Sequence, residues 1–218
     1  MEAKKFSKKE AIKFGWQKMK DNFWFFISLF AVTFLISIGS EINLTLIKKG
    51  PSALLIFSYL IFYFLLILIS MGLIKIALKL HDNEKTKIAD LFSSYPLFFK
   101  YVFGLVIYFL IVFIGTLFFF VPGIIFAIKF CFFDYFIIDK EIGPIEAFKK
   151  SSEITKGIKW NLFLFFLLIT IVNILGAICF LVGLFFTVPT TMMAVVFVYR
   201  KLAGQKENNL AVEELETF

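Results

Sequence analysis

The sequence predicts an all-α, polytopic membrane protein in which six transmembrane helices form three hairpins, each preceded by a cytoplasmic amphipathic helix. Three observations predict this fold. The chain is 60% hydrophobic and 18% charged, whereas soluble domains average about 45–50% and about 25%. Four long runs carry almost no charge, and the basic residues gather in alternate connections between those runs.

The first two uncharged runs predict one span each. Residues 22–40 contain no charged side chain, and neither do residues 50–74. A helix needs about 20 apolar residues to cross about 30 Å of hydrocarbon. Each run therefore has the length of a single crossing.

The two longer runs predict two spans each. Residues 101–138 contain only two charged side chains, and Pro122-Gly123 lies near their middle. Proline ends a helix and glycine permits a reversal, so we expect a tight turn there. Residues 160–199 are uncharged and contain Gly176, Gly183 and Pro189 in their middle, which predicts a second tight hairpin. The sequence therefore predicts structural turns at Pro122, Gly123 and Pro189.

The distribution of basic residues predicts the orientation. Residues 1–21, 75–100 and 139–160, together with the segment from residue 200 onward, carry 20 of the 23 basic residues. The alternate connections carry only two lysines. By the positive-inside rule both termini are cytoplasmic, and we expect a multi-pass protein of the plasma (inner) membrane.

The three predicted cytoplasmic segments show the apolar spacing of surface helices. In the first, the apolar residues are Ile12, Trp16, Met19 and Phe23. In the second, they are Ile88, Leu91, Phe92 and Tyr95. The third, residues 144–159, starts with Pro144 and has Glu146 in its first turn, which favours a helix start. A cleavable signal peptide is the competing interpretation of segment 1–40.

The order of elements predicts a single integral membrane domain over residues 1–204, followed by a flexible cytoplasmic tail, 205–218. An amphipathic helix followed by a hairpin occurs three times, which gives the candidate repeats 1–80, 81–138 and 139–204. Glu10-Ala11-Ile12-Lys13 in the first repeat matches Glu146-Ala147-Phe148-Lys149 in the third. Chance matches are common in so phenylalanine-rich a chain, so the repeated topology is the stronger argument.

Residues 121–176 contain several motifs in a fixed order. The motifs are Val121-Pro122-Gly123-Ile124-Ile125, Ala127-Ile128-Lys129-Phe130, Gly143-Pro144-Ile145-Glu146-Ala147-Phe148-Lys149-Lys150-Ser151, and Thr155-Lys156-Gly157 with Trp160 after it. This stretch resembles an uncharacterised prokaryotic multi-pass family that includes the membrane domain attached to some glycerophosphodiester phosphodiesterases. The family-motif residues are Glu146, Ala147, Ser151 and Gly157.

The resemblance implies a membrane protein and little chemistry. Where such a domain is joined to a phosphodiesterase, catalysis belongs to a separate soluble barrel. Only the short segment 205–218 follows Gly204, so we expect no catalytic domain here. Ser152 departs from the pattern, since relatives often carry an aromatic residue at this position.

Lys129 is the most informative single residue because a charge at the centre of a span costs about 2.5–3.5 kcal/mol on insertion scales. One interpretation is a cation that faces the bundle interior and binds an anionic headgroup or a transported anion. The other is a lysine that extends to the interface or pairs structurally. Asp134 lies further along the same predicted helix, at a spacing that is poor geometry for a pair within one helix.

Lys149, Lys150 and Lys156 form a second candidate site for anions or lipid headgroups. On an interfacial helix each could reach a lipid phosphate, with a contribution of about 1 kcal/mol. The alternative is that this segment only anchors the cytoplasmic face and sets the topology.

Little in the sequence suggests catalysis or metal binding. There is one histidine, and the two cysteines, Cys131 and Cys179, lie far apart in separate apolar stretches, so zinc-site spacing is absent. Asp139 and the nearby glutamates have the pattern of solvated loop charges, and no paired carboxylates converge. We therefore predict no catalytic residue, no metal site and no cofactor.

The sequence therefore predicts a non-enzymatic integral membrane protein that organises lipid or partner proteins at the cytoplasmic face. The alternative, from another class, is a small transporter or permease for an anionic or lipid-like solute. The expected partners are membrane lipids and other membrane proteins. The net charge of +7 fits an anionic membrane surface better than nucleic acid, and the sequence does not indicate an oligomeric state.

Overall fold

The computed structural model describes residues 6–50, 52–179 and 182–216, and the side chains up to residue 205. All regular secondary structure in these ranges is helical. The elements are α1 (Lys8–Asp21), α2 (Phe23–Lys49), α3 (Ala53–His81), η1 (Ile88–Phe92), η2 (Tyr95–Leu97), α4 (Phe98–Phe118), α5 (Phe120–Lys129), α6 (Phe133–Lys140), α7 (Pro144–Ile154), α8 (Lys159–Ile178) and α9 (Leu184–Glu216), where η marks a 3₁₀-helix.

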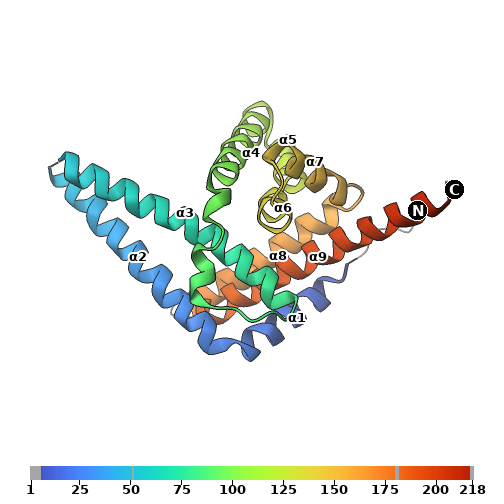
Figure 1. The fold of residues 1–218 in the computed structure, drawn as a ribbon, viewed down its shortest axis with the longest axis horizontal. Coiled ribbons are helices and arrows are strands. Elements are labelled where there is room, and N and C mark those ends of the chain that lie inside the picture. Colours follow the sequence, from blue (N-terminus) through green and yellow to red (C-terminus); the bar gives the residue numbers. More distant parts are fainter. Residues whose placement is uncertain (1–5, 51, 180–181, 217–218) are drawn as a thin grey trace.

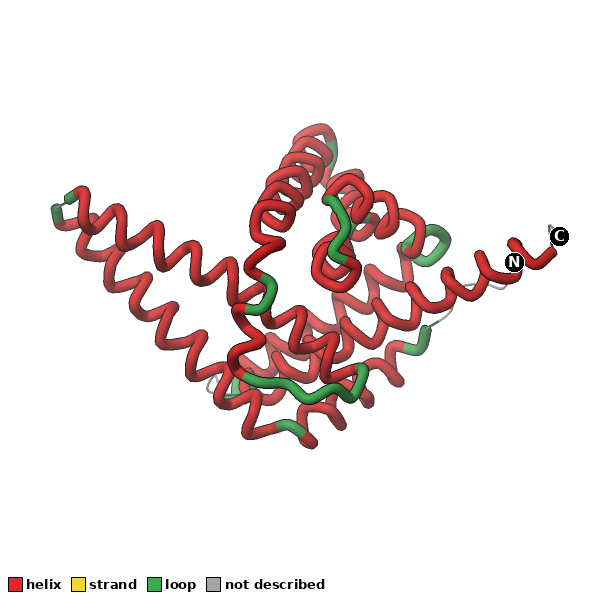
Figure 2. The backbone as a smooth tube through the Cα atoms, viewed as in Figure 1, coloured by secondary structure: helices red, strands yellow, loops and turns green. Residues whose placement is uncertain are grey.

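The helices form a splayed arrangement in which separate arms diverge from a common base (Figure 1). The α2–α3 hairpin is one long arm, and α4 with α5 forms another. Helix α1 runs along α9 at the base, although they lie at opposite ends of the sequence. Figure 2 shows that short loops join the helices.

Within the described residues, five helical stretches are long and apolar enough to cross a membrane, so the chain is an all-helical protein with several candidate spans. They are Phe23–Lys49, Ala53–His81, Ile88–Phe118, Phe120–Lys140 and Lys159–Ile178. The first three apolar runs of the sequence lie in these stretches, but the second half of the run 160–199 lies in α9, which is not among them.

Helix α1 forms where the sequence predicts it, and Met19 of the predicted apolar stripe is buried, but the rest of the buried face differs. Ser7 caps the helix, with its Oγ accepting a hydrogen bond from the Glu10 N–H at 3.3 Å. The buried residues are Ala11, Gly15 and Met19, whereas Trp16 of the predicted apolar stripe is 45% exposed. Gly15 faces α9 because the two backbones approach closely there: a Cβ at position 15 would lie 2.1 Å from the Thr190 carbonyl oxygen.

The second of the predicted cytoplasmic segments consists of two 3₁₀-helices, η1 and η2, and so differs from the predicted α-helix. Asp90 shapes η1, since its carboxylate accepts from the Lys87 N–H at 2.8 Å and pairs with Lys79 at 2.9 Å. Leu91 is fully buried against α3. The third segment forms α7, an α-helix that begins at Pro144, where the sequence predicts it.

The prediction of a turn at Pro122-Gly123 is wrong by about one helical turn. The chain reverses at Phe119, which is extended (φ −162°, ψ 145°) and precedes the first residue of α5. Pro122 therefore lies in the first turn of α5, where a missing N–H costs nothing. Gly115 and Gly123 close the hairpin, because a Cβ on Gly115 would lie 3.2 Å from the Gly123 Cα.

Pro189 is also not a turn residue, because it lies inside α9. The reversal precedes it, between the end of α8 at Ile178 and the start of α9 at Leu184. Gly176 and Gly183 meet across it, since a Cβ at Gly183 would lie 2.4 Å from the Gly176 carbonyl oxygen. Small residues that allow close backbone approach, rather than prolines, close both hairpins.

The predicted tail, 205–218, continues α9 as helix through Glu216, and residues 217–218 lie outside the described chain. Helix-favouring alanine, leucine and glutamate in this segment account for the continuation. The single domain over residues 1–204 and the candidate repeats 1–80, 81–138 and 139–204 stay predictions.

The tightly packed core lies at the base, where α1, α3, α6, α7, α8 and α9 meet. Its largest fully buried side chains include Tyr199, Phe132 and Phe165. By contrast, the outer parts of the arms expose large apolar side chains, such as Leu54 at 76% and Phe118 at 72%. This distribution is the reverse of a soluble protein and matches surfaces that face lipid.

Candidate functional site

The most distinctive polar arrangement is a break between α5 and α6, at residues 130–132, that α7 braces. The Ser151 Oγ accepts from the Phe132 N–H at 3.2 Å and donates to the Lys129 carbonyl at 3.2 Å. The Thr155 Oγ1 lies 3.0 Å from the same carbonyl and 2.9 Å from the Ser151 carbonyl of its own helix, so its single proton is shared between two acceptors. Ser151 and Thr155 are fully buried. The two hydroxyls therefore satisfy backbone groups that the interrupted helix leaves without partners.

The family-motif residues take structural positions around this brace. Ala147 is fully buried on the inner face of α7, and Ser151 follows it by one turn. Glu146 is exposed and pairs with Lys150 at 3.4 Å. Gly157 has φ +84°, a left-handed conformation that glycine adopts without strain. The motif therefore encodes a helix, a brace and the turn that follows.

Lys129 is the last residue of α5 and lies at the break, where its side chain is half-buried. Its Nζ lies 5.0 Å from the centre of the Phe130 ring, a cation–π contact. It makes no ion pair within the described residues. Its carbonyl oxygen is the acceptor of the brace, so part of the role of this position is structural.

The structure does not bring the four predicted binding lysines together. Lys149 and Lys156 are exposed at different positions of α7 and the turn after it, and Lys150 pairs with Glu146. Lys129 lies at the α5–α6 break beneath the braced face of α7. Binding of an anion or lipid headgroup by these lysines stays a prediction.

A charge cluster that sequence reasoning missed ties α9 to two other helix ends. Arg200 pairs with Asp139 at 2.7 Å and also with Asp82, and the Tyr199 hydroxyl donates to Asp139 at 2.9 Å. Burial acts to lower the pKa of Arg200, but the charges of Asp139 and Asp82 outweigh it and raise that pKa. The interpretation of Asp139 as a solvated loop charge is wrong, because its side chain is only 10% exposed.

Two signals could have pointed to this cluster. Arg200 is the single arginine among 23 basic residues, and arginine is suited to contacting two carboxylates at once. Asp139 also follows a buried apolar stretch of α6 directly. Neither signal identifies the partner, because Asp82 lies 118 residues earlier.

Asp134 is the acidic residue that lies inside the predicted fourth span. Its Oδ1 accepts from the Tyr135 N–H at 2.9 Å. No basic side chain pairs with it in the described part of the chain, so the predicted poor geometry toward Lys129 agrees with the structure. Nearby on α3 and α4, Ser70 donates to the Tyr101 hydroxyl at 3.4 Å.

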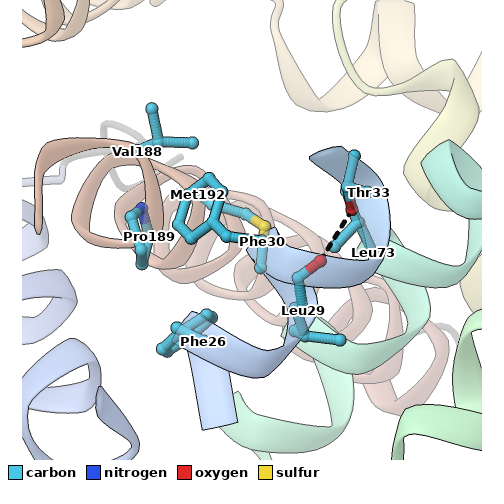
Figure 3. Close-up of a pocket in the computed structure, with 8 residues that line it drawn as sticks. All are labelled: Phe26, Leu29, Phe30, Thr33, Leu73, Val188, Pro189 and Met192. Atoms are coloured by element: carbon cyan, nitrogen blue, oxygen red, sulfur yellow. Dashed lines mark hydrogen bonds between the residues drawn. The ribbon is translucent and has the colours of Figure 1, made fainter. Parts of the chain in front are cut away.

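A small apolar pocket of about 70 Å³ lies between α2, α3 and α9 (Figure 3). Its lining residues are Phe26, Leu29, Phe30, Thr33, Leu73, Val188, Pro189 and Met192. Thr33 is the only polar one of these, and its hydroxyl donates to the Leu29 carbonyl at 2.9 Å, the dashed line in the figure. The pocket therefore suits part of a hydrocarbon chain and provides no anchor for a polar ligand.

Within the described residues, no group of three histidine, cysteine or acidic side chains could hold a metal ion. Cys131 and Cys179 are both free. The hydroxyls of Ser151 and Thr155 form hydrogen bonds with backbone carbonyls and, for Ser151, with a backbone N–H. The arrangement thus supplies bracing and charge pairing.

Similar proteins are distant and uncharacterised. The chain is 29% identical over 161 residues to the uncharacterised protein Rv2560 of Mycobacterium tuberculosis and equally to Mb2590 of Mycobacterium bovis. The match covers 72% of this chain and 49% of each relative, so the chain spans about half the length of the curated relatives it matches. No family model and no solved structure matches the chain.

Proposed function

We propose that this protein is a non-enzymatic integral membrane protein that organises lipid, or partner proteins, at the cytoplasmic face of the plasma membrane. The proposal rests on one observation: among the described residues, the most buried polar side chains stabilise the fold and form no pocket for a reaction. Ser151 and Thr155 brace a helix break, and Arg200 joins Asp82 and Asp139. The surfaces left exposed are mainly apolar arms with lysines at their base.

The proposal includes a topology of six spans in three hairpins with both termini cytoplasmic. Residues 184–199 at the start of α9 are the sixth span, and α5 with α6 together form the fourth. The exposed tryptophans support this topology: Trp16, Trp24 and Trp160 are 45%, 79% and 69% exposed and lie on α1 or at the starts of α2 and α8. Tryptophan is enriched at membrane interfaces.

Reporter fusions test the topology. A reporter after Lys49, in the connection between α2 and α3, is expected on the outer side, and one after Glu141, between α6 and α7, in the cytoplasm. The positive-inside distribution of lysine is the physical reason. Reporters that lie on the same side at both sites would contradict the three-hairpin topology.

Lipid analysis tests the function. The full chain, purified in a mild detergent, is expected to retain phospholipid whose composition differs from that of the bulk membrane. An unrelated multi-pass protein purified in the same way is the control. Purified protein that carries no lipid, or lipid of bulk composition, would contradict the lipid-organising function.

A small transporter or permease for an anionic or lipid-like solute is the second candidate, and the α5–α6 break favours it. Interrupted helices near the bilayer midplane form solute sites in many transporters, and Lys129 lies at this break. Proteoliposomes loaded with candidate anions test it. Uptake that Lys129→Leu abolishes, with membrane level unchanged, would favour transport, whereas a Lys129→Leu variant with normal cellular phenotype would leave the lysine a structural role.

A further inference from the structure

An open groove lies between the first half of α4 and the start of α7. It consists of two adjoining hollows of about 540 Å³ and about 550 Å³, and Phe103 and Pro144 line both. The other lining residues are Phe99, Lys100, Val102 and Val106 of α4, and Gly143, Ile145, Glu146 and Lys149 at α7.

One wall of this α4–α7 groove is an exposed apolar ridge. Phe99, Phe103 and Val106 are 83%, 55% and 50% exposed, and their spacing of four and three positions places them on one face of α4. The ridge extends about 10 Å along the helix axis, from the lysine-rich base toward the apolar arm. Its shape and direction fit a hydrocarbon chain aligned with the spans.

The other end of the α4–α7 groove is positively charged. Lys149 is exposed and has no polar partner among the described residues. The Lys100 Nζ donates to the Glu141 carbonyl at 2.8 Å, which keeps its charge beside the groove. Glu146, the acidic residue of the lining, is neutralised by Lys150 at 3.4 Å.

The start of α7 adds to this positive end. Its N-cap, Gly143, provides no side-chain hydrogen bond. Pro144 has no N–H and the Ala147 N–H bonds the Gly143 carbonyl, so the N–H groups of Ile145 and Glu146 are the ones available to an anion. The apolar ridge and the basic end are therefore joined in one groove, and together they have the polarity of an amphiphile with an anionic head.

We propose that the α4–α7 groove binds one anionic phospholipid, with an acyl chain along Phe99, Phe103 and Val106 and the phosphate at Lys149 and Lys100. The net positive charge at the polar end selects an anionic lipid over a zwitterionic one, because a neutral headgroup gains less from two lysines. This inference rests on the proposed lipid-organising function and names the lipid class and the site.

Native mass spectrometry of the full chain in detergent, with added phosphatidylglycerol or phosphatidylcholine, tests the site. The wild type is expected to bind phosphatidylglycerol more tightly. Lys149→Gln should weaken that binding about fivefold, the equivalent of about 1 kcal/mol for one lysine near a phosphate. Lys156→Gln is the matched control, since Lys156 is an exposed lysine just after α7 that does not line the groove.

Each outcome separates the inference from the function on which it rests. Equal losses in Lys149→Gln and Lys156→Gln, or no loss in either, would overturn the groove site while lipid retention itself still supports the function. A wild type that retains only zwitterionic lipid would overturn the lipid class alone. A wild type that retains no lipid would overturn both.

Soluble glycerol 3-phosphate distinguishes a lipid from a free phosphate compound. It shares the headgroup chemistry but lacks the acyl chains, so it is expected to displace phosphatidylglycerol only weakly. Displacement at concentrations equal to those of the lipid would show that the apolar ridge contributes nothing and would overturn the assignment to a lipid. Both lysine variants are surface changes, and an unchanged unfolding midpoint checks that they fold.

Discussion

The brace at the α5–α6 break predicts a specific cost for losing one hydroxyl. Ser151→Ala removes the hydrogen-bond partner that the described chain provides for the Phe132 N–H, in a site with no exposed surface. The Lys129 carbonyl keeps its bond from Thr155. One buried unsatisfied N–H costs about 1–3 kcal/mol, so we expect Ser151→Ala to lower the free energy of unfolding by about 2 kcal/mol.

Two further variants sharpen this prediction. Thr155→Val preserves shape but removes a hydroxyl whose proton is shared between the Lys129 and Ser151 carbonyls, so its cost should be smaller, about 1 kcal/mol. Combining it with Ser151→Ala leaves the Lys129 carbonyl without either donor, and the loss should exceed the sum of the single effects because the two hydroxyls share an acceptor.

Equilibrium unfolding of the purified chain in detergent–lipid micelles measures these changes. Ser152→Ala is the matched control, since Ser152 is adjacent on α7 and only half-buried, and it should change the free energy of unfolding by less than about 0.5 kcal/mol. If Ser151→Ala were no more destabilising than Ser152→Ala, the brace would not stabilise the break and the reasoning would be refuted.

Three other substitutions have expected effects on the same unfolding measurement. Gly72→Ala should prevent stable folding, because its Cβ would lie 2.0 Å from a backbone oxygen of η1. Gly204 has open space around it, so Gly204→Ala should leave the free energy of unfolding unchanged or raise it slightly. Equal effects of the two substitutions would contradict the close α3–η1 contact. Arg200→Gln leaves Asp139 without its cation, so it should lower the free energy of unfolding by about 2 kcal/mol. The loss is smaller than for a fully buried pair because the guanidinium is partly exposed. An unchanged free energy of unfolding would show that the cluster is solvated. Gly157→Ala should cost roughly 1–2 kcal/mol from its left-handed backbone, and an unchanged midpoint would mean that the turn adapts.

The positions of the apolar helices could be predicted from sequence, but their interruptions could not. The uncharged residues 22–40 lie almost wholly within α2 and residues 50–74 largely within α3, because length and hydropathy are local. The prolines misled the prediction, since a proline is tolerated in the first turn of a helix as at Pro122. The break at residues 130–132 contains neither glycine nor proline, so no local signal marks it.

The candidate site shows the same division between local and long-range information. The residues Glu146, Ala147, Ser151 and Gly157 could be singled out as a group from the sequence. Their roles depend on contacts with an earlier part of the chain, as in the Ser151 bond to the Phe132 N–H. Likewise, the charge of Asp139 is explained only by Arg200, 61 residues later.

The packing of α1 along α9 has a consequence for assembly during synthesis. Glu10 and Lys201, which pair at 3.2 Å, are 191 residues apart. At about 5–20 residues per second, α1 leaves the ribosome roughly 10–40 s before its partner exists. During that interval its apolar face can be shielded only by the membrane surface or a chaperone. The last helix to be made therefore completes the packing of the first, and a chain that stops before α9 leaves α1 without its partner.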